Sequence, residues 1–410
     1  MVTALTALTV VVAGVASLFM AWAIGAGSSG STPFAPAVGA NAISVLRAGL
    51  VVGVLGFAGA VLQGQNVTEA VGTSLILGVE LSAVAATVGL LTAATLVAVG
   101  VFAGYPVATA FTVTGAVVGV GLALGGTPAW GKYGEIVALW VSVPFVGGGV
   151  AYATARLLRA DGVPERVVVP TLAGAVGGTV ANVEFAPLGG PEGSASLSQA
   201  AATSLSMPVG AVAGVDPTAA AVTAVAVAVA GGALARDMAR DAETGQRRFL
   251  LSLGGLVAFS AGGSQVGLAI GPLVPLLGGP VSVPLSMVLA AGGLGLLAGS
   301  WTGAPRMIKA LSQDYSNLGP RRSIAALIPS FLIAQTAVAF GVPVSFNEII
   351  VSAIVGSGYA AGDAGVSRRK MAFTVLAWVG SLALALALSY AVMTAVTATA
   401  GAVPGVEAGA

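Results

Sequence analysis

The sequence predicts an all-α polytopic membrane protein, with about twelve transmembrane spans in two inverted repeats that contain broken or re-entrant helices. Three observations support this fold class: the composition, a series of long apolar runs, and an internal repeat. Of 410 residues, 57% are hydrophobic and 8% are charged, and the mean hydropathy is +0.99. Soluble domains carry about 25% charged residues. A chain with so few charges could not cover a water-facing surface, which excludes soluble enzymes and disordered scaffolds.

The composition also excludes several kinds of site. The formal net charge is +1, so the basic surface of a nucleic-acid-binding protein is not expected. With 0 Cys and 0 His, disulfides, thiol chemistry, haem ligation by His and the usual zinc sites are excluded. The 60 Gly and 20 Pro residues indicate helices that pack closely and break often, as in transporters. We expect no enzymatic activity and no cofactor, with Na⁺ as one candidate coupling ion.

Apolar runs give the order of the expected spans. The first covers residues 4–24, and we expect a retained span rather than a cleaved leader, because it has no basic flank and exceeds the roughly 7 to 15 apolar residues of a signal peptide. Segment 188–216 is weakly apolar and is expected to be a loop, with a short interfacial helix as the alternative. The further apolar runs cover residues 44–64, 73–103, 105–124, 135–157, 167–187, 217–235, 249–275, 283–301, 323–341, 343–361 and 371–397.

The internal repeat is visible as pairs of similar motifs at a nearly constant separation, from 236 residues (27 to 263) to 238 residues (140 to 378). The pairs are GSS at 27–29 with GSQ at 263–265, GYPVA at 104–108 with GVPVS at 341–345, GAVVGVGLA at 115–123 with SAIVGSGYA at 352–360, and Trp140 with Trp378. Chance similarity between Gly-rich apolar helices is the alternative. The expected organisation is a first repeat over 1–160, linking spans and loops over 161–247, and a second repeat over 248–400.

The basic residues predict that the two halves are inverted. Loops that stay in the cytoplasm are enriched in Lys and Arg. Lys and Arg are absent from the N-terminus, loop 65–72 and the C-terminal tail, whereas the matching segments of the other half contain them. Those basic residues are Arg236, Arg240, Arg247 and Arg248, then Arg306, Lys309, Arg321 and Arg322, and at the end of the first repeat Arg156, Arg159 and Arg166. We therefore expect a multi-pass protein of the cell membrane with both termini extracellular.

Two repeated motifs interrupt the apolar pattern and are the first candidates for a substrate site. Segments 25–40 and 262–272 are rich in Gly, Pro and hydroxyl residues, and broken backbone at membrane depth survives only where it is buried in protein or lines a cavity. The N-termini of half-helices attract anions, and hydroxyls can donate to anion oxygens or, with carbonyls, ligate sodium. The alternative is ordinary small-residue helix packing. The candidate anion-binding residues are Ser28, Ser29, Thr32, Ser264 and Gln265, and the surroundings of Ser28 and Ser264 are a candidate place for sodium, with the metal itself left unknown.

The Gly-x-Pro-Val motifs at 104–107 and 341–344 mark two further breaks. A proline between apolar runs suits a re-entrant hairpin or a tightly turned pair of helices, and a helix that simply starts at the proline is the alternative. The polar residues that follow complete the candidate anion site: Thr109, Thr112, Ser345 and Asn347.

Three carboxylates fall inside apolar runs: Glu80, Glu184 and Glu348. Ionisable residues within the membrane are functional suspects by default. Glu348 is the strongest of the three, because it lies within the second Pro-Val motif. We expect it to be a coupling carboxyl that exchanges a proton, with sodium attraction from a wet vestibule as the alternative.

These motifs resemble the inorganic phosphate transporter (PiT) family, which includes sulfate permeases. The family's GANDVANA pattern is similar to 26–40, which keeps Phe34, Val38 and Gly39, and its IGP element is similar to Ile270, Gly271 and Pro272. The family's GxPVSTTHTIVGAIVG is similar to 104–119 and 341–356, and its G-x-x-V-T-D/E element matches Gly64, Val67, Thr68 and Glu69. The resemblance implies twelve spans in two inverted repeats and oxyanion uptake driven by a sodium or proton gradient.

The sequence departs from the family at its polar positions. The family's Asn-Asp pair corresponds to Ser28-Ser29 and to Ser264-Gln265, its second Asn to Thr32 and Leu268, and its His to Phe111 and Glu348. A carboxylate in the site favours phosphate, which has a proton to donate, over sulfate, which only accepts. Its loss makes sulfate more plausible here than in a typical member, and it leaves the coupling ion open.

Together these features predict a secondary active transporter, a symporter of inorganic phosphate that works by alternating access. A sulfate permease is the alternative within transport, and a non-transporting membrane sensor of the same fold is the alternative outside it. The expected partners are inorganic phosphate or sulfate and the lipid bilayer, without nucleic acid, and a homodimer is left open.

Overall fold

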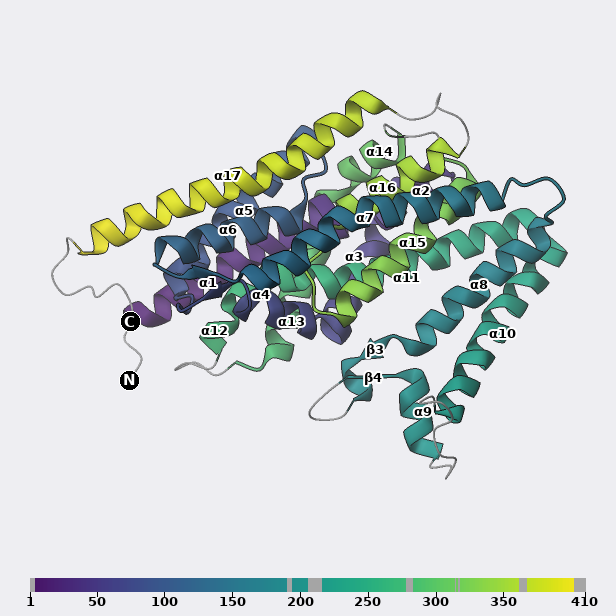
Figure 1. Cartoon of the computed structure of the whole chain (residues 1–410), viewed down its shortest axis with the longest axis horizontal. Helices are drawn as coiled ribbons and strands as arrows, with labels where there is room; N and C mark the ends of the chain where they lie inside the picture. The colour runs from purple at the N-terminus through teal and green to yellow at the C-terminus, as the bar shows by residue number, and fades with distance from the viewer. Residues whose placement is uncertain are drawn as a thin grey trace.

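The computed structural model describes residues 4–189, 194–205, 216–277, 283–313, 315, 318–360 and 367–401. Long helices dominate it, and most lie roughly along the long axis of the molecule (Figure 1). The first series of helices is α1 (Ala4–Ile24), the π-helix η1 (Gly25–Ser29), α2 (Ala35–Gly39), α3 (Val45–Gln63), α4 (Gln65–Thr73), α5 (Ala83–Ala103), α6 (Thr109–Ala123) and α7 (Trp130–Leu157). A two-residue strand β1 (Ile76–Leu77) pairs antiparallel with β2 (Thr127–Pro128).

A second series follows after a linking region and has the same order of elements. The linking elements are α8 (Glu165–Asn182), β3 (Glu184–Phe185), the 3₁₀ helix η2 (Ala186–Leu188), β4 (Ala195–Ser196), α9 (Leu197–Leu205) and α10 (Pro217–Arg240), with β3 antiparallel to β4. The second series is α11 (Ala242–Ile270), the 3₁₀ helix η3 (Gly271–Leu273), α12 (Val274–Leu277), α13 (Leu285–Thr302), α14 (Ala304–Gln313), α15 (Pro320–Ala339), α16 (Phe346–Tyr359) and α17 (Arg368–Gly401).

Corresponding helices of the two series run in opposite directions. α1 begins at the left-hand end of Figure 1 and α11 runs back towards that end, and α7 and α17 are likewise opposed. Packing partners are exchanged in the same way: α3 packs on α11 and α1 on α13, while α6 packs on α17 and α16 on α7. This arrangement is consistent with two inverted repeats, whose boundaries stay a prediction. The helix that opens the second series begins at Ala242, six residues before the expected boundary.

In the described residues, nine helices are long and apolar enough to cross a membrane. Three of the twelve expected spans, which became α6, α8 and α16, are not among them. Runs 105–124 and 343–361 begin with non-helical Gly-x-Pro-Val segments, which leaves helices of 15 and 14 residues. At 1.5 Å per residue these span about 21 to 23 Å, less than the roughly 30 Å hydrocarbon core. α5–α6 and α15–α16 are helix pairs joined by tight turns, and α5 ends at Gly104 with φ of +73°.

The expected break of the helix at 262–272 is wrong for most of that segment. η1 and the turn after it do interrupt the first motif, but α11 continues through Ser264 and Gln265 to Ile270 and changes to η3 only at Gly271. The glycines there serve close packing. A Cβ on Gly262 would overlap the backbone carbonyl of Gly56 on α3, so the helices approach as closely as they do because Gly262 has no side chain.

Two carboxylates assigned to apolar runs lie outside helices. Glu80 is exposed in the loop before α5, and Glu184 is exposed on β3, where its Oε2 accepts a hydrogen bond from Ser194 Oγ at 2.6 Å. Neither lies within a candidate membrane-spanning helix. The weakly apolar segment 188–216 contains the short helix α9 in its described part.

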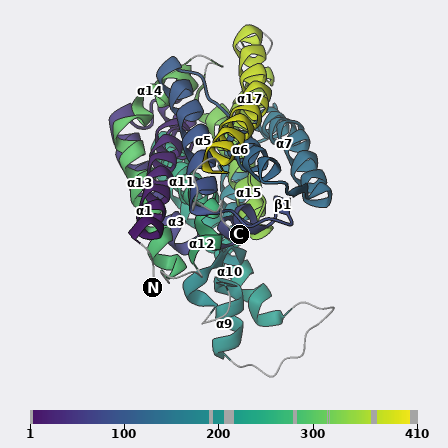
Figure 2. The same cartoon turned by 90° about the vertical axis from the view of Figure 1, so that its left-hand side faces the viewer.

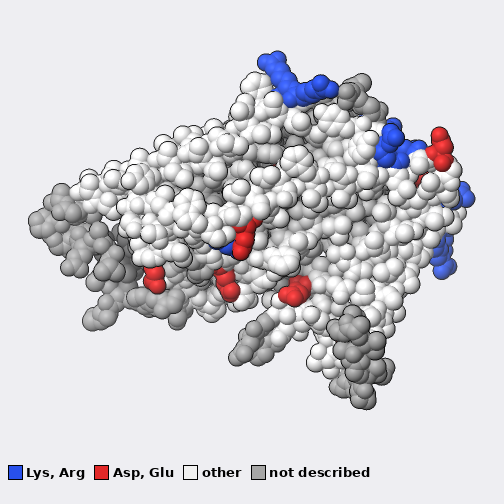
Figure 3. Space-filling view, viewed as in Figure 1, with Lys and Arg blue, Asp and Glu red and all other residues white. Residues whose placement is uncertain are grey.

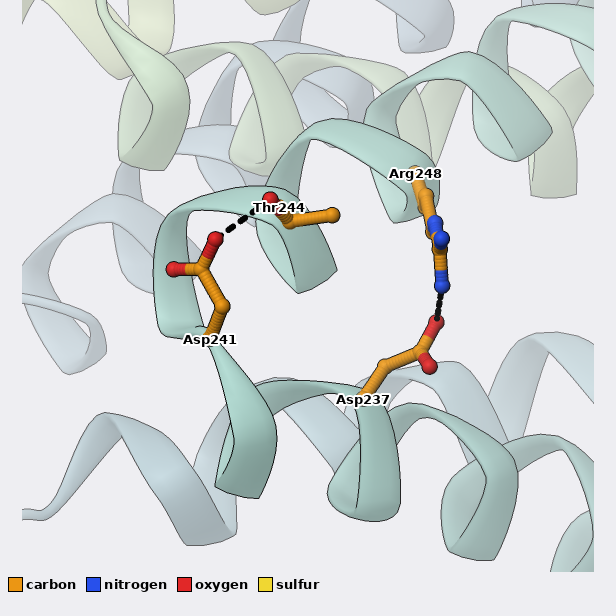
Figure 4. A network of polar contacts seen from close by, with 4 residues as sticks. All are labelled: Asp237, Asp241, Thr244 and Arg248. Atoms are coloured by element: carbon orange, nitrogen blue, oxygen red, sulfur yellow. Dashed lines mark hydrogen bonds and ion pairs between the residues drawn. The ribbon is translucent and has the colours of Figure 1, made fainter.

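Most Lys and Arg side chains on the face shown in Figure 3 gather at the end where α17 begins and where α7 turns into α8. The turn from α10 to α11 lies at the same end and carries its own polar network (Figure 4). Arg248 pairs with Asp237 at 2.9 Å, and Asp241 caps α11 by accepting from Glu243 N at 3.1 Å and Thr244 Oγ1 at 2.5 Å. The Thr244 hydrogen bond holds the pKa of Asp241 below its ordinary value.

Candidate functional site

A buried polar cluster lies where η1, α6, α11 and α16 meet, so both series of helices contribute to it. We define the central polar cluster as Ser28, Thr109, Gln265 and Asn347, all 0% exposed. No member is charged. Buried polar groups are costly unless they are hydrogen-bonded, so the partners of each side chain indicate what the cluster is built for.

Gln265 joins three elements through one carboxamide. Its Oε1 accepts from Ser28 Oγ at 3.1 Å and from Thr109 Oγ1 at 2.7 Å. Its Nε2 donates to the carbonyl of Val344, in the second Pro-Val motif, at 2.6 Å. Ser28 of the GSS motif and Gln265 of the GSQ motif are therefore in direct side-chain contact.

Asn347 joins α16 to the π-helix η1 and to the first Pro-Val motif. Its Nδ2 donates to the carbonyl of Gly27 at 2.9 Å and to the carbonyl of Val107 at 2.6 Å. Its Oδ1 has no hydrogen-bond partner among the described residues. A free acceptor is therefore left at the centre of the molecule.

Three buried hydroxyls next in sequence to residues of the central polar cluster, or to the Val344 carbonyl that bonds it, also lack partners within the described part of the chain: those of Ser29, Ser264 and Ser345. Each is 2% exposed or less and adjoins a residue that bonds within the cluster. A hydroxyl both donates and accepts, so the three can donate to an oxyanion or offer lone pairs to a hard cation. An unpaired buried polar group costs about 1 to 3 kcal/mol, which a ligand at this place would recover.

The N-termini of α6 and α16 add backbone donors at the same place. Neither has a side-chain cap at its first turn, although α16 begins right after Ser345. The first N–H groups of a helix have no intrahelical partner, and with the helix dipole they favour an anion. α6 contributes Thr109 and α16 contributes Asn347 to the cluster, so both N-termini face it.

Two tryptophans fix the Pro-Val motifs reciprocally. Trp140 Nε1 on α7 donates to the carbonyl of Pro343 at 3.1 Å, and Trp378 Nε1 on α17 donates to the carbonyl of Pro106 at 2.8 Å. Each half of the protein therefore donates a hydrogen bond to the non-helical Pro-Val segment of the other half. The sequence marks these tryptophans only as members of the repeat. Their role depends on which half each one contacts, which spacing does not reveal.

The other predicted hydroxyls are satisfied within their own segments. Thr32 Oγ1 donates to the carbonyl of Ser28 at 3.0 Å, and Thr112 Oγ1 donates to the carbonyl of Ala108 at 2.9 Å. Both residues are fully buried. Their participation in anion binding stays a prediction.

Glu348 follows Asn347 in α16, but its carboxylate faces another cavity. It is 2% exposed, and its Oε2 has no partner among the described residues. It lines a space of about 880 Å³ together with Phe111, Trp140 and Trp378. Phe111 stacks on Trp140 with ring centroids 3.8 Å apart.

A second polar region was not predicted. Gln335 Nε2 donates to Ser260 Oγ at 2.6 Å and to Gln63 Oε1 at 3.3 Å, and Gln63 Nε2 donates to the carbonyl of Glu184 at 2.7 Å. Gln63 and Gln335 line a cavity of about 930 Å³ that also contacts Glu69 and Glu184. The available sequence signal was two Gln residues in apolar runs at the ends of α3 and α15.

Comparison with known proteins agrees with this architecture. The model of the phosphate transporter family matches residues 24–389. Inorganic phosphate transporter 2-1, chloroplastic, of Arabidopsis thaliana is 26% identical over 88% of this chain and 67% of its own length. A protein of Pyrococcus abyssi named as a phosphate permease is 27% identical over 88% of this chain and 91% of its own. A solved structure described as the sodium-dependent phosphate transporter has the same fold, with a TM-score of 0.78 and 23% identity over 95% of this chain and 99% of that one. The chain is therefore a multi-pass membrane protein that belongs to the phosphate transporter family.

Proposed function

We propose that this protein is a secondary active transporter that carries inorganic phosphate across the cell membrane by alternating access, in symport with Na⁺ or protons. The names of the relatives motivate the substrate. The observation that carries the proposal is a set of unpartnered buried groups: Asn347 Oδ1 within the central polar cluster, and the hydroxyls of Ser29, Ser264 and Ser345 close to it in sequence.

These groups suit a tetrahedral oxyanion. The three hydroxyls donate to its oxygens, and the N-termini of α6 and α16 supply backbone N–H groups and positive potential. Asn347 Oδ1 accepts the proton that hydrogen phosphate still carries. Sulfate has no such proton and would leave this acceptor unpaired, which favours phosphate over sulfate at this site.

Sodium is the coupling ion that the site suits best. The central polar cluster has no carboxylate, so a phosphate dianion with two sodium ions would be neutral without any charge from the protein. Hydroxyl, amide and carbonyl oxygens are ligands that hard cations accept. The solved structure with the same fold is described as sodium-dependent, which supports this choice. Proton coupling through Glu348 is the alternative.

Alternating access requires that the contacts between the halves can be remade. Gln265 and Asn347 carry the side-chain hydrogen bonds that join the halves within the cluster. We propose that these open on one side as the halves rock. We propose that phosphate reaches the central polar cluster through the cavity lined by Gln63 and Gln335. Gln335 bonds to Ser260, and Ser260 lies one turn before Ser264 on α11.

Uptake into proteoliposomes tests the function. Labelled phosphate should accumulate when an inward Na⁺ gradient is applied, and a tenfold excess of unlabelled sulfate should compete weakly. Strong competition would favour the sulfate permease, and no flux of either anion under any gradient is the result that the sensor alternative predicts. If Glu348→Gln abolishes accumulation driven by a pH gradient while downhill exchange persists, proton coupling replaces the sodium proposal.

A further inference from the structure

The cavity that Glu348 lines lies between α7 and α17. The two long helices diverge, with α6 between them (Figure 2). Residues of α6 and α16 form the floor of the groove, and its volume is about 880 Å³. We call this the α7–α17 groove. It is lined by aromatic and aliphatic side chains from all four helices, among them Trp140, Phe145, Tyr152, Val351, Tyr359 and Trp378.

One carboxylate interrupts this apolar lining. Glu348 is the single charged residue that lines the groove, it is 2% exposed, and its Oε2 has no partner within the described part of the chain. Successive residues of a helix point about 100° apart, which lets Asn347 bond into the cluster while Glu348 lines the groove. The groove is therefore separate from the proposed phosphate site.

The rim of the groove belongs to the outer apolar surface. Val141, Phe145 and Val379 line it and are 59%, 76% and 57% exposed. In a helix of a membrane protein such side chains face acyl chains. A ligand would therefore reach Glu348 from the lipid phase, along apolar walls.

We propose that the α7–α17 groove binds a lipophilic amine, with its alkyl chain between α7 and α17 and its nitrogen against the Glu348 carboxyl. The amine enters uncharged, because a charge would be costly in the groove. The carboxyl then transfers its proton to the amine nitrogen, so that ammonium and carboxylate appear in contact and total charge is conserved. The rings of Trp140 and Trp378 favour a cation further. Their indole N–H groups are already bonded to proline carbonyls.

Quenching of tryptophan fluorescence tests the proposal without reference to transport. The protein would carry Trp22→Phe, Trp130→Phe and Trp301→Phe, which leaves the two tryptophans that line the groove. In lipid nanodiscs, 12-bromododecylamine should quench them saturably, whereas 12-bromododecanol should quench only in proportion to its concentration in the bilayer. Equal saturable quenching by the alcohol would overturn the proposal, since the groove would then hold any alkyl chain.

Variants at the carboxylate complete the test. Glu348→Gln should weaken the saturable quenching at least tenfold, while Glu348→Asp, which keeps a carboxyl group that can transfer a proton, should retain most of it. Glu135→Gln removes an exposed carboxylate from α7 and is the matched control, expected to bind like the parent. An unchanged midpoint in Glu348→Gln would contradict the proposal. If Glu348→Gln does not fold, Glu348→Asp and the alcohol comparison decide it.

Discussion

Gln265 carries more of the junction between the halves than any other side chain in the central polar cluster. A single amide can accept twice and donate twice, and here it accepts from Ser28 and Thr109 while it donates to Val344. The repeat marked Gln265 and the GSS motif as equivalent candidate sites but did not predict their contact. The sequence also does not show which threonine of α6 reaches Gln265. Thr109 and Thr112 both lie in the first turn of α6, and only tertiary packing selects between them.

We expect Gln265→Leu to abolish phosphate uptake while the protein still inserts. Leucine leaves the hydroxyls of Ser28 and Thr109 and the carbonyl of Val344 without their partner, at about 1 to 3 kcal/mol for each unsatisfied group. Uptake into proteoliposomes and thermal unfolding in detergent measure the two effects. The control is Ser330→Ala, which removes a buried hydroxyl bonded inside its own helix at 2.7 Å. Normal uptake by Gln265→Leu would show that the site lies elsewhere.

At the scale of elements, the Pro-Val motifs show what local sequence predicts and what it does not. A proline after a glycine predicts the breaks before α6 and α16, since the glycine C-cap and the rigid proline end one helix before the next begins. The continuous α11 was not predictable in the same way. Gly262 and Gly263 read as breakers, but their contacts with α3 make them packing residues, and a contact partner is a tertiary property.

The reciprocal tryptophan contacts predict a matched pair of effects. Trp140→Phe and Trp378→Phe keep an aromatic ring and remove the N–H that reaches Pro343 or Pro106. Each should lower phosphate uptake several-fold and destabilise the protein by about 1 kcal/mol, the net value of a hydrogen bond. Trp301→Phe is the control, because its Nε1 donates to the carbonyl of Leu50, outside both motifs. Loss of uptake in the control alone would contradict this assignment.

The cap of α11 predicts a dependence of stability on pH. The hydrogen bond from Thr244 lowers the pKa of Asp241 in the folded protein. The carboxylate therefore stabilises the fold at pH values above the pKa of an aspartate in the unfolded chain, about 4. That stabilisation is lost as the pH falls through the pKa of Asp241 in the folded protein. Asp241→Asn should therefore melt at a lower temperature than the wild type at pH 7. Thermal unfolding from pH 7 to 3 should show the two curves converging, and a constant difference would rule out this origin.

For the whole molecule, the gathering of Lys and Arg at one end predicts the orientation in the membrane (Figure 3). Basic ends stay in the cytoplasm, which places the beginning of α1 and the end of α17 outside. The chain has no native cysteine, so single cysteines report cleanly. An impermeant thiol reagent added to intact cells should label Gly131→Cys, at the start of α7, and not Lys309→Cys on α14. The reverse pattern would invert the proposed topology.

The composition and the repeat predicted the helical membrane fold, but the site depends on contacts across the two halves. Spacing relates Ser28 to Ser264, whereas the structure joins Ser28 to Gln265 and Asn347 to Gly27 and Val107. The number of helices that cross the membrane depends on where the short helices α6 and α16 lie, and hydropathy alone does not determine their position, so the twelve spans stay a prediction.

The most direct test of the central claim is the initial rate of sodium-driven phosphate uptake by Ser264→Ala in proteoliposomes. The hydroxyl of Ser264 is fully buried and has no partner among the described residues, so its removal takes nothing from the folded protein except a group for the ligand. The account predicts at least a tenfold loss of uptake rate without any loss of thermal stability, because an unpaired buried hydroxyl does not stabilise the fold, alongside normal uptake by Ser330→Ala. Uptake at the wild-type rate by Ser264→Ala would contradict it.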